Sequence, residues 1–142
     1  MWYLAGILYG NILEYVVHRY LFHGLGKKKD SMFAFHLREH HIKCRKNDYE
    51  DKRFSKVEFL GLLLLLMLHL PLLFVVPSFF GALATYAMAF IVIHNGLHFF
   101  PEFGKKYFKW HWNHHMRNQN KSWGVVLPIT DIFTGTMEKP RE

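Results

Sequence analysis

The feature that most restricts the fold of this chain is a long stretch without charge. The 43 residues from 59 to 101 contain no Asp, Glu, Lys or Arg. A soluble domain of 142 residues seldom withholds charge over such a length, whereas a membrane helix needs about 20 mainly apolar residues to cross the hydrocarbon layer. The stretch is therefore long enough for two membrane crossings.

The hydropathy pattern predicts three membrane-spanning helices. The first is apolar, with aromatic residues near its start and Arg19 close to its end. Pro77 and Ser78 are predicted to form a tight reversal between the second and third spans. Lys and Arg flank the span ends on one side only, and the positive-inside rule places that side in the cytoplasm. The predicted spans are residues 2–20, 57–76 and 79–100.

The segments between and after these spans predict a cap of short helices on the cytoplasmic side, over residues 24–56 and 101–142. Residues 31–46 lack Pro and Gly and open with Ser31, a plausible helix N-cap. Residues 102–120 are predicted to form another surface helix, and turn signals follow in the tail. No repeat or linker divides the chain. We therefore predict one all-α integral membrane domain over residues 1–142, whose cap carries the histidine motifs.

Histidine is unusually frequent, since its eleven residues equal the total of Asp and Glu. Ten of them fall into four short groups, and all four groups lie at or just beyond the predicted cytoplasmic ends of the spans. The eleventh, His69, lies in mid-span among leucines and is expected to be packed or hydrogen-bonded. The four groups are His18 and His23; His36, His40 and His41; His94 and His98; and His111, His114 and His115.

The spacing within the groups is typical of metal ligands, because residues three or four apart share one face of an α-helix. His18 and His23 are five apart, about 140° around a regular helix, so one ion could not easily take both. His36 and His41 pose the same problem. Two metal ions, or a helix break near Gly24, would resolve it. Ten ligands also exceed the four to six or so that one ion usually takes, which predicts a dinuclear centre.

The types of ligand limit which metals could bind and which other groups must lie near them. Imidazole suits Zn, Fe, Cu and Ni, and a single cysteine, Cys44, argues against a sulfur cluster or an internal disulfide. Two divalent ions among neutral ligands need an anion nearby, and each bound imidazole needs an acceptor for its other N–H. The candidates for these supporting roles are Glu14, Asn95, Asn113, Asn118 and Asp131.

Four motifs resemble the membrane fatty acid hydroxylase and sterol desaturase superfamily, and the similarity covers nearly the whole chain in order. The first motif is similar to fatty acid 2-hydroxylases, and the third and fourth are also similar to bacterial carotenoid hydroxylases. The motifs are EYVVHRYLFHG (residues 14–24), FHLREHH (35–41), HNGLH (94–98) and KWHWNHH (109–115), followed by WGVVLPITDIFTGT (123–136).

The resemblance implies that the ten grouped histidines ligate a non-haem di-iron centre. In purified preparations zinc can occupy this centre in place of iron. It implies an enzyme that uses O2 and two external electrons to oxidise a C–H bond of a lipid taken from the bilayer. The chain contains no cytochrome b5 domain, so a separate electron donor, cytochrome b5-like or ferredoxin-like, is expected to dock on the basic face. The small size leaves little protein to enclose a long acyl chain, so the lipid-facing groove is expected to be shallow or to be completed by another subunit.

Other functions remain open from the sequence. Within the superfamily, the reaction could be carotenoid hydroxylation or lipid desaturation. A histidine-rich metal transporter or sensor is a different class, but it predicts ligands inside the spans, where only His69 lies deep. A structural membrane protein with incidental histidines would hold little metal. The basic residues are attributed to topology and lipid contacts, and no nucleic-acid partner is expected.

Overall fold

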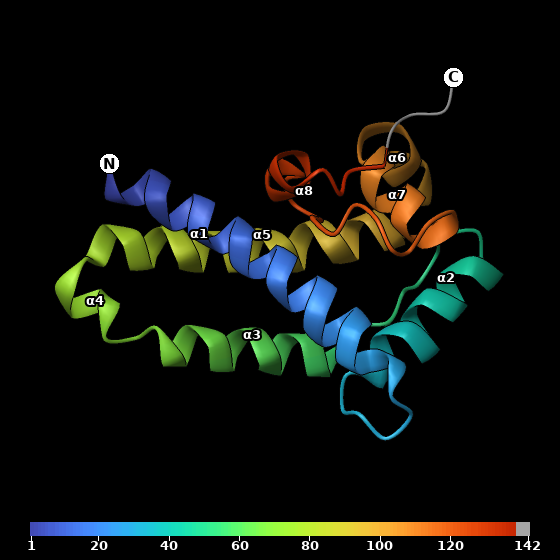
Figure 1. Ribbon diagram of the computed structural model, residues 1–142, viewed down its shortest axis with the longest axis horizontal. Helices are drawn as coiled ribbons and strands as arrows, with labels where there is room; N and C mark the ends of the chain where they lie inside the picture. Colours follow the sequence, from blue (N-terminus) through green and yellow to red (C-terminus); the bar gives the residue numbers. More distant parts are fainter. Residues whose placement is uncertain (139–142) are drawn as a thin grey trace.

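All regular elements in the described part of the chain are helices, which confirms the predicted all-α fold (Figure 1). The structure is a computed structural model that describes residues 1–138. The elements are α1 (Trp2–Val16), the π-helix η1 (Val17–Gly24), the 3-10 helix η2 (Leu25–Lys27), the π-helix η3 (His36–His41), α2 (Ile42–Lys46), α3 (Lys56–Leu68), α4 (Leu72–Val75), α5 (Pro77–Phe99), α6 (Pro101–Tyr107), α7 (Lys109–Met116) and α8 (Ile129–Thr134).

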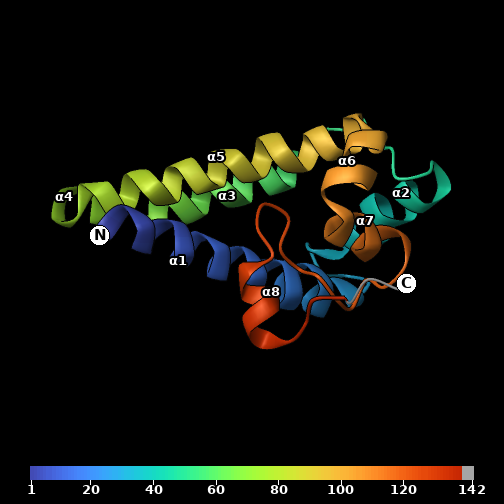
Figure 2. The same cartoon turned by 90° about the horizontal axis from the view of Figure 1, so that it is seen from above.

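The long helices extend from a cluster of short helices at one end of the molecule. Helices α2, α6 and α7 gather there, while α4 and the N-terminus lie at the opposite end (Figure 2). Helix α1 crosses α5 at an angle, and α3 runs beside α5 without covering α1 (Figure 1). Residues of α1, α3 and α5 line a common cavity.

Helices α1 and α5 pack closely because small residues lie at their crossing. A Cβ added at Gly6 would lie 2.6 Å from the Phe79 carbonyl oxygen and 2.8 Å from the Ala82 Cβ. One added at Gly10 would lie 2.7 Å from the Tyr86 ring. Small residues at such positions let helix backbones approach, as is common between membrane helices. This pair therefore forms the framework of the molecule.

The predicted second span is shorter as a helix than expected. Helix α3 begins after Ser55, whose hydroxyl accepts a hydrogen bond from the Glu58 amide at 3.2 Å. It ends after 13 residues, about 20 Å, and the chain turns before α4. Pro71 accounts for this end, because its ring lacks an amide hydrogen and clashes with the carbonyl four residues earlier. The reversal between the spans thus precedes Pro77, which is instead the first residue of α5.

The other boundaries also differ from the predictions in identifiable ways. The helix expected from residue 31 begins later, and the Ser31 hydroxyl accepts from the Phe33 amide in the turn before it. The helix expected over residues 102–120 is divided into α6 and α7 at Phe108. In the tail, α8 was not predicted, and it ends at Gly135, which has the left-handed conformation expected of a glycine C-cap.

One helix in the described residues, α5, is long and apolar enough to cross a membrane by itself. Many large apolar side chains of the long helices are exposed, including Leu60 of α3 at 60% and Val92 of α5 at 62%. The interior near the short helices is instead rich in histidine, with a small apolar cluster of Tyr49, Leu97 and Val125 beside it. The long helices are thus apolar outside, and the cap end is polar inside.

Candidate metal centre

The four histidine groups come together at the cap end of the molecule. His18 and His23 project from η1, the second group from η3, the third from the end of α5 and the fourth from α7. Nine of the ten imidazoles are buried and the tenth, His40, is partly buried. Segments separated by up to 97 positions in the chain therefore supply one cluster of rings.

The π-helices explain how histidines five residues apart can share a site. A π-helix bonds each residue to the one five positions away, so such residues lie on the same face. In η1 the rings of His18 and His23 are 5.0 Å apart between centroids, and in η3 those of His36 and His41 are 4.9 Å apart. The prediction that regular α-helical geometry separates these pairs is wrong, because the local helix is wider.

The potential ligand atoms form two adjacent histidine sets, and a third group overlaps the second set. In each set, one side-chain atom per residue lies within 4.8 Å of the others. The stacked rings of His41 and His115, 4.0 Å apart, connect the two sets. The first histidine set is His18, His23, His36, His41 and His114. The second histidine set is His94, His98, His111 and His115. The third group, His40, Cys44, His98 and His115, shares its last two members with the second set.

The inward-facing nitrogens fit metal ions better than they fit one another. His18 Nδ1 faces the Trp123 carbonyl oxygen at 2.5 Å, and His36 Nδ1 faces the Glu58 carboxylate at 3.3 Å, so both outer nitrogens carry hydrogen. Their neutral rings then direct two lone pairs at each other, with the Nε2 atoms 3.0 Å apart. Two nitrogens bound side by side to one ion at about 2.1 Å would be separated by about 3 Å.

Buried imidazole nitrogens without a hydrogen-bond partner also indicate a metal site. A buried polar group without a partner costs about 1–3 kcal/mol, so several in one place require an explanation. Metal coordination would supply a partner for one nitrogen of a ring, and His41, His111 and His115 have a second unpartnered nitrogen besides. In the described part of the chain, the buried ring nitrogens without a hydrogen bond belong to His23, His40, His41, His94, His98, His111 and His115.

Two carboxylates that were not predicted hold the outer nitrogens of three imidazoles. Glu58 lies between the sets, with one oxygen 3.3 Å from His36 Nδ1 and the other 3.3 Å from His94 Nδ1. Asp51 accepts from His40 Nδ1 at 3.2 Å. Such acceptors fix the ring orientation and tautomer of a metal ligand. The only sequence signal for Glu58 was its position as the last charge before the uncharged stretch.

Backbone carbonyls hold three further rings. The carbonyl oxygens of Trp123 and Lys121 accept from His18 and His114 respectively. The Tyr49 carbonyl oxygen accepts from His98 Nδ1 at 2.9 Å. Main-chain acceptors leave no mark on residue identity, so no sequence pattern could have identified them.

Two of the predicted supporting residues, Glu14 and Asp131, support the histidines indirectly, through the loop that contains Trp123. Glu14 accepts from the amides of Val125 and Val126 at 2.7 and 3.2 Å, and Asp131 accepts from the amides of Trp123 and Gly124 at 3.0 and 2.7 Å. They fix the segment whose Trp123 carbonyl faces His18.

The three asparagines among the predicted supporting residues are placed elsewhere. Asn95 donates to the Ile91 carbonyl, and the Asn118 side chain accepts from the Asn120 amide. The Asn113 carbonyl accepts from the amides of Arg117 and Asn118. Within residues 1–138, none of the five supporting candidates hydrogen-bonds an imidazole, because local backbone groups and loop amides satisfy them first.

Cys44 is near the second histidine set but on its outer side. Its sulfur lies 3.4 Å from His98 Nδ1 and 3.8 Å from His40 Nδ1, opposite the Nε2 atoms of those rings. Burial, and then the neighbouring Asp51, raises the pKa of the Cys44 thiol, which favours the neutral form. Cys44 therefore packs behind the ligand candidates.

The electrostatics favour cation binding. Burial, and then repulsion between neighbouring imidazoles, lowers the pKa of His111 and His114 well below the ordinary histidine value, which keeps the rings neutral. Burial alone would raise the pKa of Asp51, but hydrogen bonds from His40, Arg53 and Lys43 outweigh it and hold the pKa below its ordinary value. A negative charge is thus kept beside a set of neutral ligands, as a divalent ion requires.

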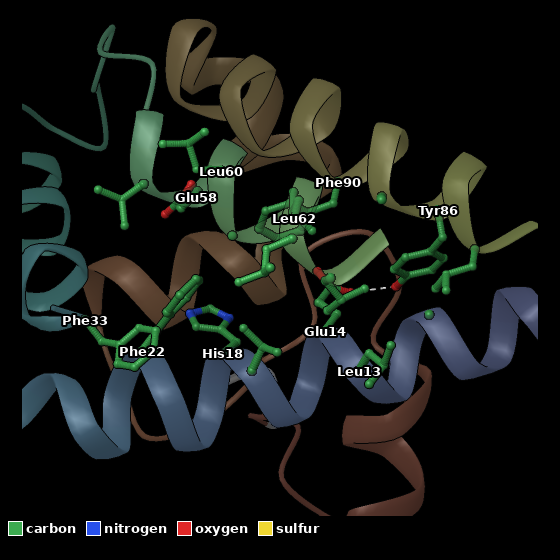
Figure 3. A pocket seen from close by; sticks show the side chains of 18 of the residues that line it. Leu13, Glu14, His18, Phe22, Phe33, Glu58, Leu60, Leu62, Tyr86 and Phe90 are labelled. Carbon is green, nitrogen blue, oxygen red and sulfur yellow. Dashed lines mark hydrogen bonds between the residues drawn. The ribbon is translucent and has the colours of Figure 1, made fainter. Parts of the chain in front are cut away.

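Two cavities reach the site from different directions. An apolar cavity of about 360 Å³ lies between α1, α3 and α5, and His18 and Glu58 are at its cap end (Figure 3). A more polar cavity of about 230 Å³ is lined by His40, His94 and charged residues that include Arg53. Glu58 lines both cavities. The candidate metal centre can therefore be approached from an apolar and from a polar side.

His69 is hydrogen-bonded as predicted. Its Nε2 lies 2.9 Å from the Tyr9 hydroxyl and its Nδ1 2.8 Å from the Leu65 carbonyl oxygen. It belongs to none of the potential ligand sets in the described residues.

The comparisons with known proteins give one match. A family model described as fatty acid hydroxylase matches residues 3–136. Neither the curated proteins nor the solved structures contain a match to the chain.

Proposed function

This chain belongs to the fatty acid hydroxylase family, and on that premise we propose that it is an O2-dependent lipid hydroxylase. The family indicates an oxidoreductase, and the histidine sets could bind metal. The observation that carries the finer proposal is the position of His18, a member of the first histidine set, at the end of an apolar cavity beside Glu58, whose carboxylate contacts both sets. A metal transporter or sensor would have no evident use for an apolar cavity next to its metal ligands.

We assign the ten grouped histidines as ligands of two metal ions, iron in the native protein, with zinc able to replace it. When bound, a pair of iron ions would supply the O2 and electron chemistry that protein side chains lack. The first histidine set would hold one ion and the second set the other. Glu58 and Asp51 would hold the outer nitrogens of His36, His94 and His40 and offset part of the added charge.

The apolar cavity would bind the hydrocarbon chain of the substrate and exclude water from the reacting carbon. Its α3 side is open to the surroundings, since Leu60 and Leu64 line it and are still 60% and 59% exposed. A lipid could therefore enter sideways from the bilayer. The polar cavity on the other side of Glu58 would admit water and protons without bringing water to the hydrocarbon chain of the substrate.

We further propose that the long helices lie in the membrane with the histidine sets at the cytoplasmic face. The cap end carries the runs Lys27 to Lys29 and Lys105 to Lys106, whereas the end formed by the N-terminus and α4 has no Lys or Arg (Figure 1). The exposed apolar surface of the long helices supports this placement. The basic cap would also receive the separate electron donor, a cytochrome b5-like or ferredoxin-like protein.

Metal analysis combined with lipid profiling tests the proposal. The purified protein should hold about two ions, and cells that express it should contain a hydroxylated lipid absent from control cells. His40→Ala and His114→Ala, one from each side of the site, should lower the metal content and abolish the product. His69→Ala is the matched control, because His69 bonds only Tyr9 and Leu65.

The outcome also separates the alternatives. A desaturated product, or a hydroxylated carotenoid, would change the reaction within the superfamily and keep the site. Metal-dependent transport without any oxidised lipid would favour a transporter or sensor. Full oxidation activity in both cap variants would rule out the assigned ligands.

A further inference from the structure

The end of the apolar cavity away from the histidines is a fixed wall formed by Tyr86. His18, Phe22 and Phe33 lie at one end of the cavity and Tyr86 at the other (Figure 3). The Tyr86 hydroxyl donates to Glu14 Oε2 at 2.5 Å and accepts from Asn11 Nδ2 at 2.9 Å. Three helical or loop segments thus hold this ring, because Glu14 is also bonded to the Val125 and Val126 amides.

Gly10 is required by this wall. The Tyr86 ring lies directly against the α1 backbone, and a Cβ at Gly10 would be 2.7 Å from its Cγ atom. Real Cβ atoms essentially never come so close, so any larger residue would displace the ring. The absent side chain at Gly10 therefore serves packing within the protein.

Gly61 also lines the cavity, but no protein atom uses the space it leaves. It lies on the cavity face of α3 with Val57 and Leu64, at helical spacing. A Cβ at Gly61 would meet nothing within 4 Å. Glycine inside a helix is less stable than alanine, so packing gives no reason for a glycine here. Gly61 is itself exposed, so the space it leaves lies on the open α3 side of the cavity.

We propose that Gly61 and Tyr86 together determine which hydrocarbon chains this protein accepts. Gly61 keeps the α3 side of the cavity wide enough for the chain, and the fixed Tyr86 ring limits how far the chain extends from the histidine end. The inference rests on the proposed function, since it takes the cavity occupant to be the chain of a lipid substrate. The ligand class is an acyl chain of limited length.

A side chain introduced at Gly61 tests the proposal by binding and by product length. Gly61→Leu places a branched side chain in the cavity, whereas Gly81→Leu is the matched control, because Gly81 also has no atom within 4 Å and does not line the cavity. Zinc-loaded protein in detergent is titrated with saturated fatty acids of increasing length against a fluorescent fatty acid. Displacing about two methylenes should weaken binding of the longest chains about tenfold, and the shortest chains much less.

The two measurements distinguish this proposal from the proposed function. If Gly61→Leu, and not Gly81→Leu, shifts binding toward shorter chains while no lipid is oxidised by the wild-type protein, the size limit stands and the hydroxylase proposal fails. If the wild-type protein oxidises lipids and Gly61→Leu leaves both the binding profile and the product lengths unchanged, the size limit is wrong. Loss of folding in Gly61→Leu is checked with Gly61→Ala, which should show a smaller shift in the same direction.

Discussion

At the scale of single residues, the site depends on which nitrogen of each imidazole is free. Six of the ten rings have Nδ1 against a carboxylate or carbonyl oxygen, which leaves Nε2 for a metal. The histidines themselves were predictable from their spacing and their groups. Glu58 and Asp51 were not, because their link to the imidazoles is made by the folded chain and by no repeat in the sequence.

Glu58 provides a prediction at this scale. Glu58→Gln should weaken zinc or cobalt binding by about 10- to 100-fold. The Glu58 carboxylate now accepts hydrogen bonds from His36 Nδ1 and His94 Nδ1, and the glutamine amide nitrogen would face one of these two N–H donors and could not accept from it. A competition titration with a metal chelator measures the change. Glu50→Gln serves as control, since within the described residues the partly exposed Glu50 carboxylate forms an ion pair only with Lys52. Equal affinity in the two variants would contradict the role of Glu58.

At the scale of elements, two helix types perform different tasks. Regular α-helices form the framework, and the π-helical turns in η1 and η3 bring histidines five apart to one face. The sequence indicated helices in these places but not their widening, since π-turns have no clear residue signature and arise where tertiary contacts outweigh the regular hydrogen bonds. The early end of α3 could have been anticipated from Pro71.

The α1 and α5 crossing provides the prediction at the element scale. Gly6→Ala should destabilise the protein by about 1–3 kcal/mol, because the new Cβ would press on the Phe79 carbonyl and on Ala82. Thermal or denaturant unfolding in detergent measures the loss. Gly81→Ala on α5 should be neutral or slightly stabilising, since its Cβ meets nothing within 4 Å. Equal stability of the two variants would mean that the helices do not pack as closely as described.

At the scale of the whole molecule, the interior of the cap is a cluster of neutral imidazoles that metal would stabilise. Many of the fully buried large side chains in the described residues are histidines, so little apolar packing holds the cap together. Any ion that binds the folded state alone adds to its stability by mass action. The cap should consequently be more stable with metal than without.

The pH dependence of the metal-free protein provides the prediction at this scale. The folded-state pKa of His111, His114 and His115 is lowered below the ordinary 6.5, so the unfolded chain takes up protons first as the pH falls. The contribution of these neutral rings to the free energy of unfolding is therefore fully present above about pH 6.5 and declines below it. Asp51, with a pKa held below 3.8, adds a loss only at more acidic pH.

Thermal unfolding of chelator-treated protein between about pH 7.5 and pH 5.5 measures this effect. The melting temperature should fall across that range and should be higher at every pH when zinc is restored. A melting temperature that is flat or rising toward acid would show that the rings are exposed or already charged.

The sequence alone determined the helical class, the position of the apolar segments and the choice of ten histidines as ligand candidates. These follow from local composition and from spacing along a helix. Only the tertiary structure decided which histidines share a set, which carboxylates and carbonyls hold them, and where the apolar cavity ends. Those features depend on atoms brought together from distant segments, such as Glu58 with His36 and His94, or Gly10 with Tyr86. Contact between distant segments is set by packing, and packing has no period that a sequence can display.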